Sequence, residues 1–419
     1  MKWMTLSVLL LACRLGAQAP PDSVGLEQFQ TLAWPVARRI EALRAERDAA
    51  AEALGAAHAQ RGPVLALEIA GGWISRTQEL QMGGRTITFG DGSSADAALQ
   101  GAWTLSAGGA LRAGEEAAAC ELRARSWDLA ADSLRLAGEL RAAFWSALAA
   151  EAGQEAAGVA VTRLERHLED LRARRSAGSA GEEALLLVES RLEVARQDQA
   201  LRRGEREAAR LELGALCGAP GQPLVPIGEL EPTMSPADEP RRPAELLALD
   251  ARLEQSRALL RQRVGAQRPR LEALAGLHLG RPGVDPVANE WMSYAATGLR
   301  LRWSLWDGGL ARRCVAEARL AGTAMARRLD EAERQSAAGL ARARELAAAA
   351  GEAWEAAARR CAVEERRGGL VEERWRQGMA TERDWLDAVD EQRLARQERA
   401  LAAARLRLAQ SRVQQALGR

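Results

Sequence analysis

Residues 299–309 read LRLRWSLWDGG, and residues 99–109, 200 positions earlier, read LQGAWTLSAGG. In both stretches hydrophobic residues alternate with small or polar residues, which is typical of a β-strand with one apolar face. Both stretches end in two glycines, which permit backbone geometry that residues with a Cβ resist. A very long helical pattern follows each pair of glycines, so the chain contains one strand-to-helix junction twice.

The same offset recurs further along the chain. The segment GSAGEEALLLVESRLEVARQ begins at Gly178, and the similar segment GMATERDWLDAVDEQRLARQ begins at Gly378. Two matches about 70 residues apart in one register indicate an internal duplication. We therefore predict a first repeat over residues 24–217 and a second over 243–418, joined by a linker rich in proline and glycine at 218–242. Each repeat has the order helix, strand, loop, strand, long helix, tight turn and long helix.

The composition favours long helices. Charged residues make up 27% of the chain and aromatic residues only 4%, and long tracts consist of the strong helix formers Ala, Leu, Glu, Arg and Gln. Helices are predicted over residues 111–176 and 310–377, and at about 1.5 Å per residue each is roughly 100 Å long. Leucines at heptad spacing predict that the helices pack side by side as coiled coils: Leu122, Leu129, Leu136, Leu394, Leu401 and Leu408. The formal net charge of +1 and the interspersed signs give no indication of nucleic-acid binding.

Four strands are predicted near residues 63–76, 96–107, 269–280 and 294–306. Their length and their alternation of apolar with small or polar residues match transmembrane β-barrel strands. Periodicity alone also allows a soluble, half-buried sheet packed on helices. Aromatic side chains in or beside the strands have the composition of a membrane-interface belt: Trp73, Trp103, Trp291, Tyr294, Trp303 and Trp306.

Four strands cannot close a barrel, and lipid does not tolerate an open sheet edge. Single-chain barrels begin at about eight strands, so a membrane location requires at least two copies of the chain, and three copies would supply twelve strands.

The N-terminus, MKWMTLSVLLLACRLGAQAPPDS, has a basic start and an apolar run too short to span a bilayer as a helix. This pattern predicts a secretory signal peptide, with two cleavage positions open. Cleavage after the small residues at 17–19 would remove residues 1–19. Alternatively, residues 10–13 form a lipoprotein box, in which case residues 1–12 are removed and Cys13 is lipidated. The other cysteines, Cys120, Cys217, Cys314 and Cys361, are dispersed and indicate neither a disulfide framework nor a zinc site.

Three segments carry a resemblance to the outer-membrane efflux protein (TolC) family. They are RPRLEALAGLHLG from Arg268, GLRLRWSLWDGGLARRCVAEARL from Gly298 and RWRQGMATERDWLDAVDEQRLARQ from Arg374. The last contains a pattern similar to the family's D-x-L-D-A at the hairpin tip. The resemblance implies a mainly α fold with a small transmembrane β part. As a trimer, this fold would form a twelve-stranded β-barrel in the outer membrane, continuous with a periplasmic α-helical barrel.

The resemblance also implies roles for the tips of the two helical hairpins. A periplasmic adaptor (membrane fusion) protein would contact Gly178, Ala180, Gly378 and Ala380, and connect the trimer to an inner-membrane transporter. Asp384 and Asp387 would form the acidic pore constriction, with six carboxylates from three chains that favour cations. The alternative is that both are ordinary solvated charges near a helix N-terminus. An arginine that often locks the family's closed tip is replaced here by Ala380.

The function implied is that of an exit duct for a tripartite efflux pump or a type I secretion system. A periplasmic adaptor or coiled-coil scaffold is the alternative, although an adaptor is expected to have one hairpin and a β-rich remainder. No nucleophile, phosphate-binding loop or cluster of metal ligands is present in the sequence, so we expect no enzymatic activity, cofactor or metal. The three histidines, His58, His167 and His278, are scattered and are interpreted as structural. The sequence does not indicate the exported substrate.

Overall fold

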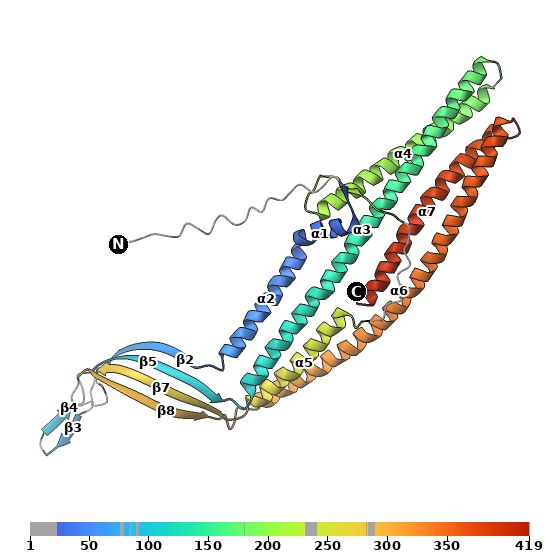
Figure 1. The fold of residues 1–419 in the computed structure, drawn as a ribbon. Helices are drawn as coiled ribbons and strands as arrows, with labels where there is room; N and C mark the ends of the chain where they lie inside the picture. The colour runs from blue at the N-terminus through green and yellow to red at the C-terminus, as the bar shows by residue number, and fades with distance from the viewer. Residues whose placement is uncertain are drawn as a thin grey trace, which may run out of the picture. The chain divides into compact units, whose positions relative to one another are not determined.

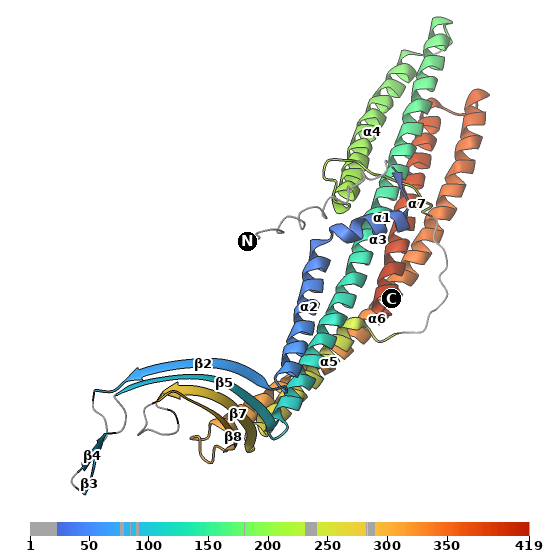
Figure 2. The same ribbon diagram turned by 60° about the vertical axis from the view of Figure 1, so that its left-hand side comes forward.

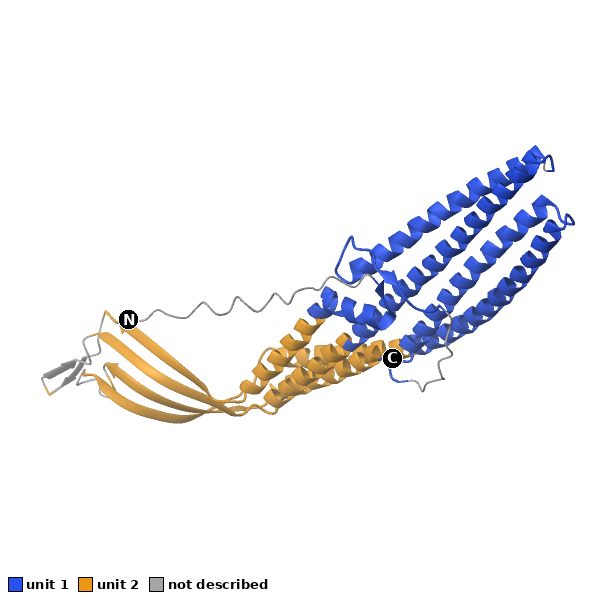
Figure 3. Ribbon diagram, turned by 45° about the horizontal axis from the view of Figure 1, so that its top comes forward, with its two compact units in different colours: residues 1–42, 130–243, 335–419 blue, residues 43–129, 244–334 orange. Residues whose placement is uncertain are grey.

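The computed structural model describes residues 23–75, 79–83, 85–88, 92–179, 181–230, 241–281, 283 and 290–418. The chain divides into two compact units (Figure 3). Unit 1 comprises residues 1–42, 130–243 and 335–419, and unit 2 comprises residues 43–129 and 244–334. The predicted signal peptide and Cys13 lie outside the described residues.

The fold is mainly helical, and from α2 and α5 onward the main strands and the long helices follow one another in the same order in both halves. The two longest helices have 67 residues each, α3 (Ala110–Ser176) and α6 (Leu310–Arg376). A tight turn joins each to a helix of 35 residues, α4 (Glu182–Leu216) or α7 (Glu382–Ala416). The shorter helices are α1 (Leu26–Ala33), the 3₁₀ helix η1 (Trp34–Val36), α2 (Arg38–Ala59) and α5 (Ala244–Gly265). Both hairpins belong to unit 1 over most of their length and are visible in Figure 1.

Unit 2 contains a four-stranded antiparallel sheet with the order β2-β5-β7-β8 (Figure 2). Its strands are β2 (Val64–Trp73), β5 (Ser93–Ser106), β7 (Arg270–Arg281) and β8 (Met292–Arg302). A small hairpin, β3 (Glu79–Met82) and β4 (Arg85–Thr88), lies between β2 and β5 in the sequence. A short parallel pair, β1 (Ser23–Val24) and β6 (Val225–Pro226), belongs to unit 1.

The last strand is shorter than the predicted range of 294–306. It ends at Arg302, whose register partner Arg270 is the first residue of β7. Pro269 precedes Arg270 and has no backbone N–H to donate, so the ladder stops there. Trp303 and Trp306 consequently follow the strand and do not belong to it.

The sheet has one apolar face and one polar face. Leu67 is the register partner of Leu99, which is in turn the partner of Leu277, so leucines form a row across three strands. These side chains are 69%, 39% and 61% exposed in the single chain. The neighbouring register row contains Glu68 and His278, which by strand alternation project from the opposite face. The alternation in the sequence therefore produces a sheet whose apolar face has no cover within the described chain.

The same hydrogen bond occurs at both strand-to-helix junctions. The indole Nε1 of Trp103 donates to the carbonyl oxygen of Arg61 at 2.9 Å, and that of Trp303 donates to the carbonyl oxygen of Gln267 at 3.2 Å. The glycine pairs also adopt matching backbone angles. The φ values are 60° and 86° at residues 108 and 109, and 67° and 86° at residues 308 and 309. Both glycines in each pair are in the left-handed region, which explains why the motif requires glycine.

The buried positions of the long helices differ from the predicted leucine heptads. Leu394 and Leu401 in α7 are 38% and 45% exposed, whereas Ala395, Ala403 and Ala404 are buried. Within one chain, this part of α7 therefore packs mainly through short alanine side chains, which allow close approach of the helices, whereas Trp385 and Leu386 are buried near its N-terminus. The largest buried clusters of unit 1 lie near the hairpin ends and where α1 contacts α3 and α4, around Phe29 and Phe144.

Candidate functional site

The two hairpin tips share one backbone conformation. Gly178 has φ 78° and Gly378 has φ 73°, and each closes the C-terminus of a 67-residue helix. In the first tip the amide of Ser179 donates to the carbonyl of Arg174 at 2.8 Å, and in the second the amide of Met379 donates to that of Arg374 at the same distance. A glycine with positive φ and a backward hydrogen bond of this kind is the common helix C-cap. The two predicted tip glycines are therefore the residues that permit each reversal.

Of the two predicted tip alanines, Ala380 is partly buried and packs against the hydrophobic cluster beneath the tips. Ala180 lies outside the described residues. No atom lies within 4 Å of a Cβ placed on either tip glycine, so a side chain there would meet open space.

Asp384 forms a capping box at the start of α7. Its carboxylate accepts hydrogen bonds from the Thr381 amide at 2.9 Å and from the Thr381 hydroxyl at 2.6 Å. In return, the amide of Asp384 donates to the Thr381 hydroxyl oxygen at 3.2 Å. These hydrogen bonds hold the pKa of Asp384 below its ordinary value. The first repeat has Gly181 and Ala184 at the equivalent positions, and α4 has no side-chain cap.

Asp387 has a different environment, which the sequence did not reveal. It forms an ion pair of 3.5 Å with Arg191 of α4, and Arg191 also contacts Asp390 at 3.2 Å. Burial raises the pKa of the Asp390 carboxyl, although Arg393 and Arg191 act in the opposite direction. The structure therefore brings Asp387 and Asp390 together around Arg191, and it assigns the Asp384 carboxylate to the helix cap.

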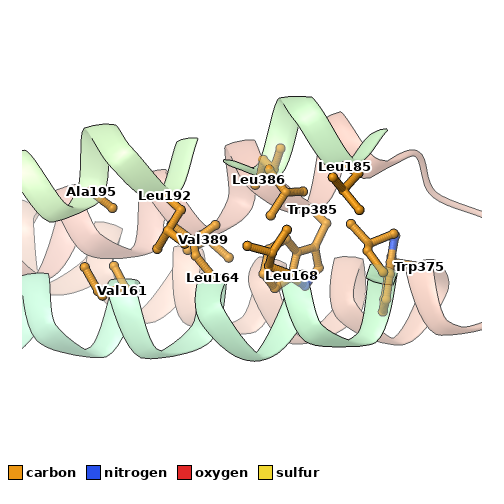
Figure 4. Close-up of a cluster of buried hydrophobic side chains, with 13 residues drawn as sticks. Val161, Leu164, Leu168, Leu185, Leu192, Ala195, Trp375, Trp385, Leu386 and Val389 are labelled. Atoms are coloured by element: carbon orange, nitrogen blue, oxygen red, sulfur yellow. The ribbon is translucent and has the colours of Figure 1, made fainter. Parts of the chain in front are cut away.

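One hydrophobic cluster lies beneath both tips (Figure 4). It combines Leu164 and Leu168 of α3 and Leu185 of α4 with Trp385 and Leu386 of α7. The packing joins the hairpin of the first repeat to that of the second. Its members are Ala160, Val161, Leu164, Leu168, Leu171, Leu185, Val188, Leu192, Ala195, Trp375, Trp385, Leu386 and Val389.

His167 is a buried polar residue within this cluster. Its ring stacks on Trp385 with centroids 3.8 Å apart and meets the edge of Trp375 at 4.5 Å. His167 is also hydrogen-bonded to Glu382, and a carboxylate oxygen of Glu382 accepts from the Trp375 indole at 3.0 Å. The buried imidazole thus contacts two aromatic rings and a carboxylate, which is consistent with the structural role expected from the sequence.

The predicted interface tryptophans occur at both ends of the sheet. Trp73 ends β2 and is 75% exposed, and Trp291 directly precedes β8. At the other ends of the strands, Trp103 lies on the apolar face of β5, and Trp303 follows β8. The aromatic side chains therefore lie at two levels along the strand direction, separated by the apolar leucine rows.

Tyr294 differs from the predicted tryptophans. It is the register partner of His278 on the polar face of the sheet, and the two rings stack 4.8 Å apart. His278 in turn contacts Asp96 at 3.1 Å. Tyr294 therefore belongs to a polar group and does not share the face of Trp103.

Among the described helices, none combines the length and the hydrophobicity that a transmembrane helix requires. The described residues also contain no group of three or more His, Cys, Asp or Glu side chains that could hold a metal ion.

Comparison with known proteins gives a family and a fold. Residues 36–219 match the family model of outer membrane efflux proteins, a family of efflux proteins and not of enzymes. No curated protein matches the chain. Solved structures match over 94% of the chain. These include CusC (16% identity, 92% of that chain, TM-score 0.77), VceC from Vibrio cholerae (16%, 96%, 0.74) and the open state of MtrE from Neisseria gonorrhoeae (19%, 88%, 0.74). The match confirms the predicted mainly helical fold with a small β part.

Proposed function

Because residues 36–219 match the outer membrane efflux protein family, we propose that the chain is a passive outer-membrane channel that acts as a homotrimer. The channel would be the exit duct of a tripartite efflux pump or a type I secretion system. It would lead from the periplasm to the exterior and receive its cargo from an inner-membrane transporter through an adaptor protein.

The sheet is the observation that carries this proposal. One of its faces is apolar and exposed, and its outer strands β2 and β8 each have one edge without a partner among the described strands. In lipid, unpaired backbone groups on such edges are not tolerated. Because β2 and β8 run antiparallel within the sheet order, β8 of one copy can pair antiparallel with β2 of the next. Three copies would close a barrel of twelve strands.

Exposed apolar side chains on the long helices support association between copies. In α4, Leu187, Val194 and Leu201 are 37%, 58% and 62% exposed, and they follow one another at intervals of seven residues. In α6, Val363 and Leu370 have the same spacing and are 56% and 60% exposed. Apolar residues at heptad spacing normally pack into a neighbouring helix. Neighbouring copies would supply that helix and enclose a helical tunnel.

We further propose that Asp384 and Asp387 narrow the tunnel with negative charge, six carboxylates in a trimer, and favour cations there. The ion pair to Arg191 partly neutralises Asp387, so Asp384 would carry more of this effect. Replacing both with asparagine should reduce the preference for cations in bilayer conductance. Unchanged selectivity in this double variant would show that both are surface charges.

The adaptor would dock at the tips, at Gly178, Ala180, Gly378 and Ala380. Two tip glycines with positive φ leave the backbone exposed to a partner hairpin, and no side chain covers it.

The alternative, a periplasmic adaptor or scaffold, is separated from a channel by three measurements. We expect detergent-extracted protein to co-fractionate with the outer membrane, to migrate as a trimer and to conduct ions in a planar bilayer. Recovery as a soluble periplasmic monomer would contradict the channel.

Cross-linking tests the closure of the sheet directly. A cysteine in β8 at Ala296 would be combined with a cysteine scanned along β2 from Ala66 to Ala70, in a chain without its native cysteines. We expect cross-links between chains at one register. Cysteines in the inner strands β5 and β7 are the matched control and should give none, because those strands are already paired on both sides.

The N-terminal alternatives are separated by intact-mass analysis. A lipidated N-terminus would add the mass of acyl chains at Cys13, and Cys13→Ser would remove it. A mature chain beginning at or after Gln18 would establish ordinary cleavage.

A further inference from the structure

Charges on the polar face of the sheet are separated along the strands. Arg270, Arg300 and Arg302 lie at the end where β7 begins and β8 stops. Glu272 is the acidic residue beside them on this face, so this end carries two net positive charges in each chain. Farther along the strands, the charged residues of the same face are Glu68 and Asp96.

The register places two of these arginines in direct opposition. Arg270 of β7 is the partner of Arg302 of β8, and like charges directly opposite each other destabilise an antiparallel pair. Sequence alternation alone does not require this arrangement, because any polar residue satisfies a solvated face. A nearby negative charge is therefore needed to reduce the repulsion between the two opposed arginines.

The neighbouring groups supply that charge only in part. The Nε of Arg270 contacts Glu272 at 2.8 Å, and Arg300 reaches the second oxygen of the same carboxylate at 3.8 Å. Arg270 also donates to the Thr104 hydroxyl at 2.9 Å. The described residues provide no side-chain hydrogen bond or ion pair to the guanidinium of Arg302. One carboxylate thus serves two guanidinium groups, and the third has no partner among the described residues.

We propose that Arg270, Arg300 and Arg302 form an anion-binding belt that takes carboxylate or phosphate groups of solutes passing along the polar face. The inference rests on the proposed function, since the belt encircles a lumen only if copies of the sheet close with this face inward. Three copies would then carry six net positive charges at one level of the channel.

Geometry and chemistry both suit such a ligand. Directly opposed residues have Cβ atoms about 4.5 to 5.5 Å apart, so two guanidinium groups can share one anion. The planar fork of arginine matches carboxylate and phosphate oxygens in a bidentate manner. All three side chains lie at an exposed surface, where an anion would be bound weakly enough to move on, as conduction requires.

The polar group at the other end of the face is different in character. Asp96 contacts His278, Tyr294 stacks on that histidine, and the described strands place no arginine on the polar face there. Anion preference is accordingly expected at the belt and not along the whole sheet.

The test is the selectivity of wild-type and variant channels in planar bilayers, measured as reversal potentials in a potassium chloride gradient. Salt is kept near 0.1 M, where the screening length is about 10 Å, because higher concentrations shorten it and weaken the effect of the charges. We expect Arg270→Gln with Arg302→Gln to lower the permeability of chloride relative to potassium by about twofold or more, because the two substitutions remove six positive charges per trimer and leave no net charge at this level. Glu272→Gln is the matched control of opposite sign and should raise the same ratio.

A second readout separates charge from recognition. Inorganic phosphate added to the bath should reduce the wild-type current, and Arg302→Lys should weaken this block while leaving the chloride preference unchanged, because lysine keeps the charge but not the fork. Circular dichroism and trimer migration of each variant exclude misfolding. If the variant channels have the same selectivity and the same phosphate block as the wild type, the belt alone is overturned. A wild-type protein that forms trimers but no conducting pore would overturn the proposed channel, and the belt with it.

Discussion

The capping box at the start of α7 leads to a prediction in which each repeat serves as the control for the other. Thr381→Ala removes the hydroxyl that accepts from the Asp384 amide at 3.2 Å and donates to the Asp384 carboxylate at 2.6 Å. Loss of such a cap costs about 1 kcal/mol, which corresponds to roughly a fivefold change in the local opening equilibrium. We expect amide exchange in the first turn of α7, over residues 382–386, to accelerate by about that factor.

The assay is hydrogen exchange followed by mass spectrometry on the detergent-solubilised trimer. The first turn of α4 is an internal reference, because Gly181 supplies no side-chain cap there and its exchange should stay the same. Asp384→Ala should have a similar effect to Thr381→Ala, and the double variant should add little, because both changes break the same hydrogen bonds. Asp384→Asn should have a smaller effect, because its amide oxygen can still accept from the Thr381 amide. Additive effects of the two alanine variants, or equal acceleration in α4, would refute the assigned capping role.

The remaining predictions concern the tips and their core. Trp385→Ala should lower the free energy of unfolding by about 3 to 5 kcal/mol, since the ring is buried against His167; thermal melts should show almost no shift for the control Trp306→Ala, whose ring is 87% exposed. The pKa of Asp384 is lower in the folded protein than its ordinary value, so the ionised carboxylate stabilises the fold fully above the ordinary pKa. This stabilisation is lost as the pH falls through the pKa of the folded state. Asp384→Asn should therefore flatten the acidic part of a curve of Tm against pH. Gly378→Leu should weaken co-purification with the adaptor while the trimer still forms, since a side chain at φ 73° strains the turn by about 1 to 2 kcal/mol; the same outcome is expected for Gly178→Leu, and normal coupling in both would contradict docking at the tips.

Several features could be predicted from the sequence because they depend on local patterns. The double glycine after each strand needs positive φ, and both pairs have it. The 200-residue offset implied that the hairpin helices have the same lengths in both repeats. Local periodicity and the tip glycines determine where each of these helices starts and stops. The strand faces followed from alternation. The same alternation places Tyr294 on the face of Arg300, opposite that of Leu299.

Other features depend on tertiary contacts that no local pattern contains. The pairing of Arg191 with Asp387 joins residues of two different hairpins. The early end of β8 depends on where its partner β7 begins, and the exposure of Leu394 and Leu401 depends on alanines elsewhere on the same helix that allow a closer fit. Such contacts are set by how the helices and strands meet, so the sequence could provide candidates for them but not the pairs.

The two tips share one backbone conformation, but only the second has a side-chain cap on the following helix. This difference would lower the symmetry of a ring built from both tips. A ring of six equivalent hairpins would be sixfold, and every hinge in it would open together or not at all. In the proposed trimer, one capped and one uncapped hairpin per chain would lower this to threefold symmetry, with two kinds of hinge in alternation. Such a ring can widen in stages, with the weaker set of helix ends yielding before the stronger set. The difference between the tips at Thr381 and Asp384 would then set the order in which the helix ends move.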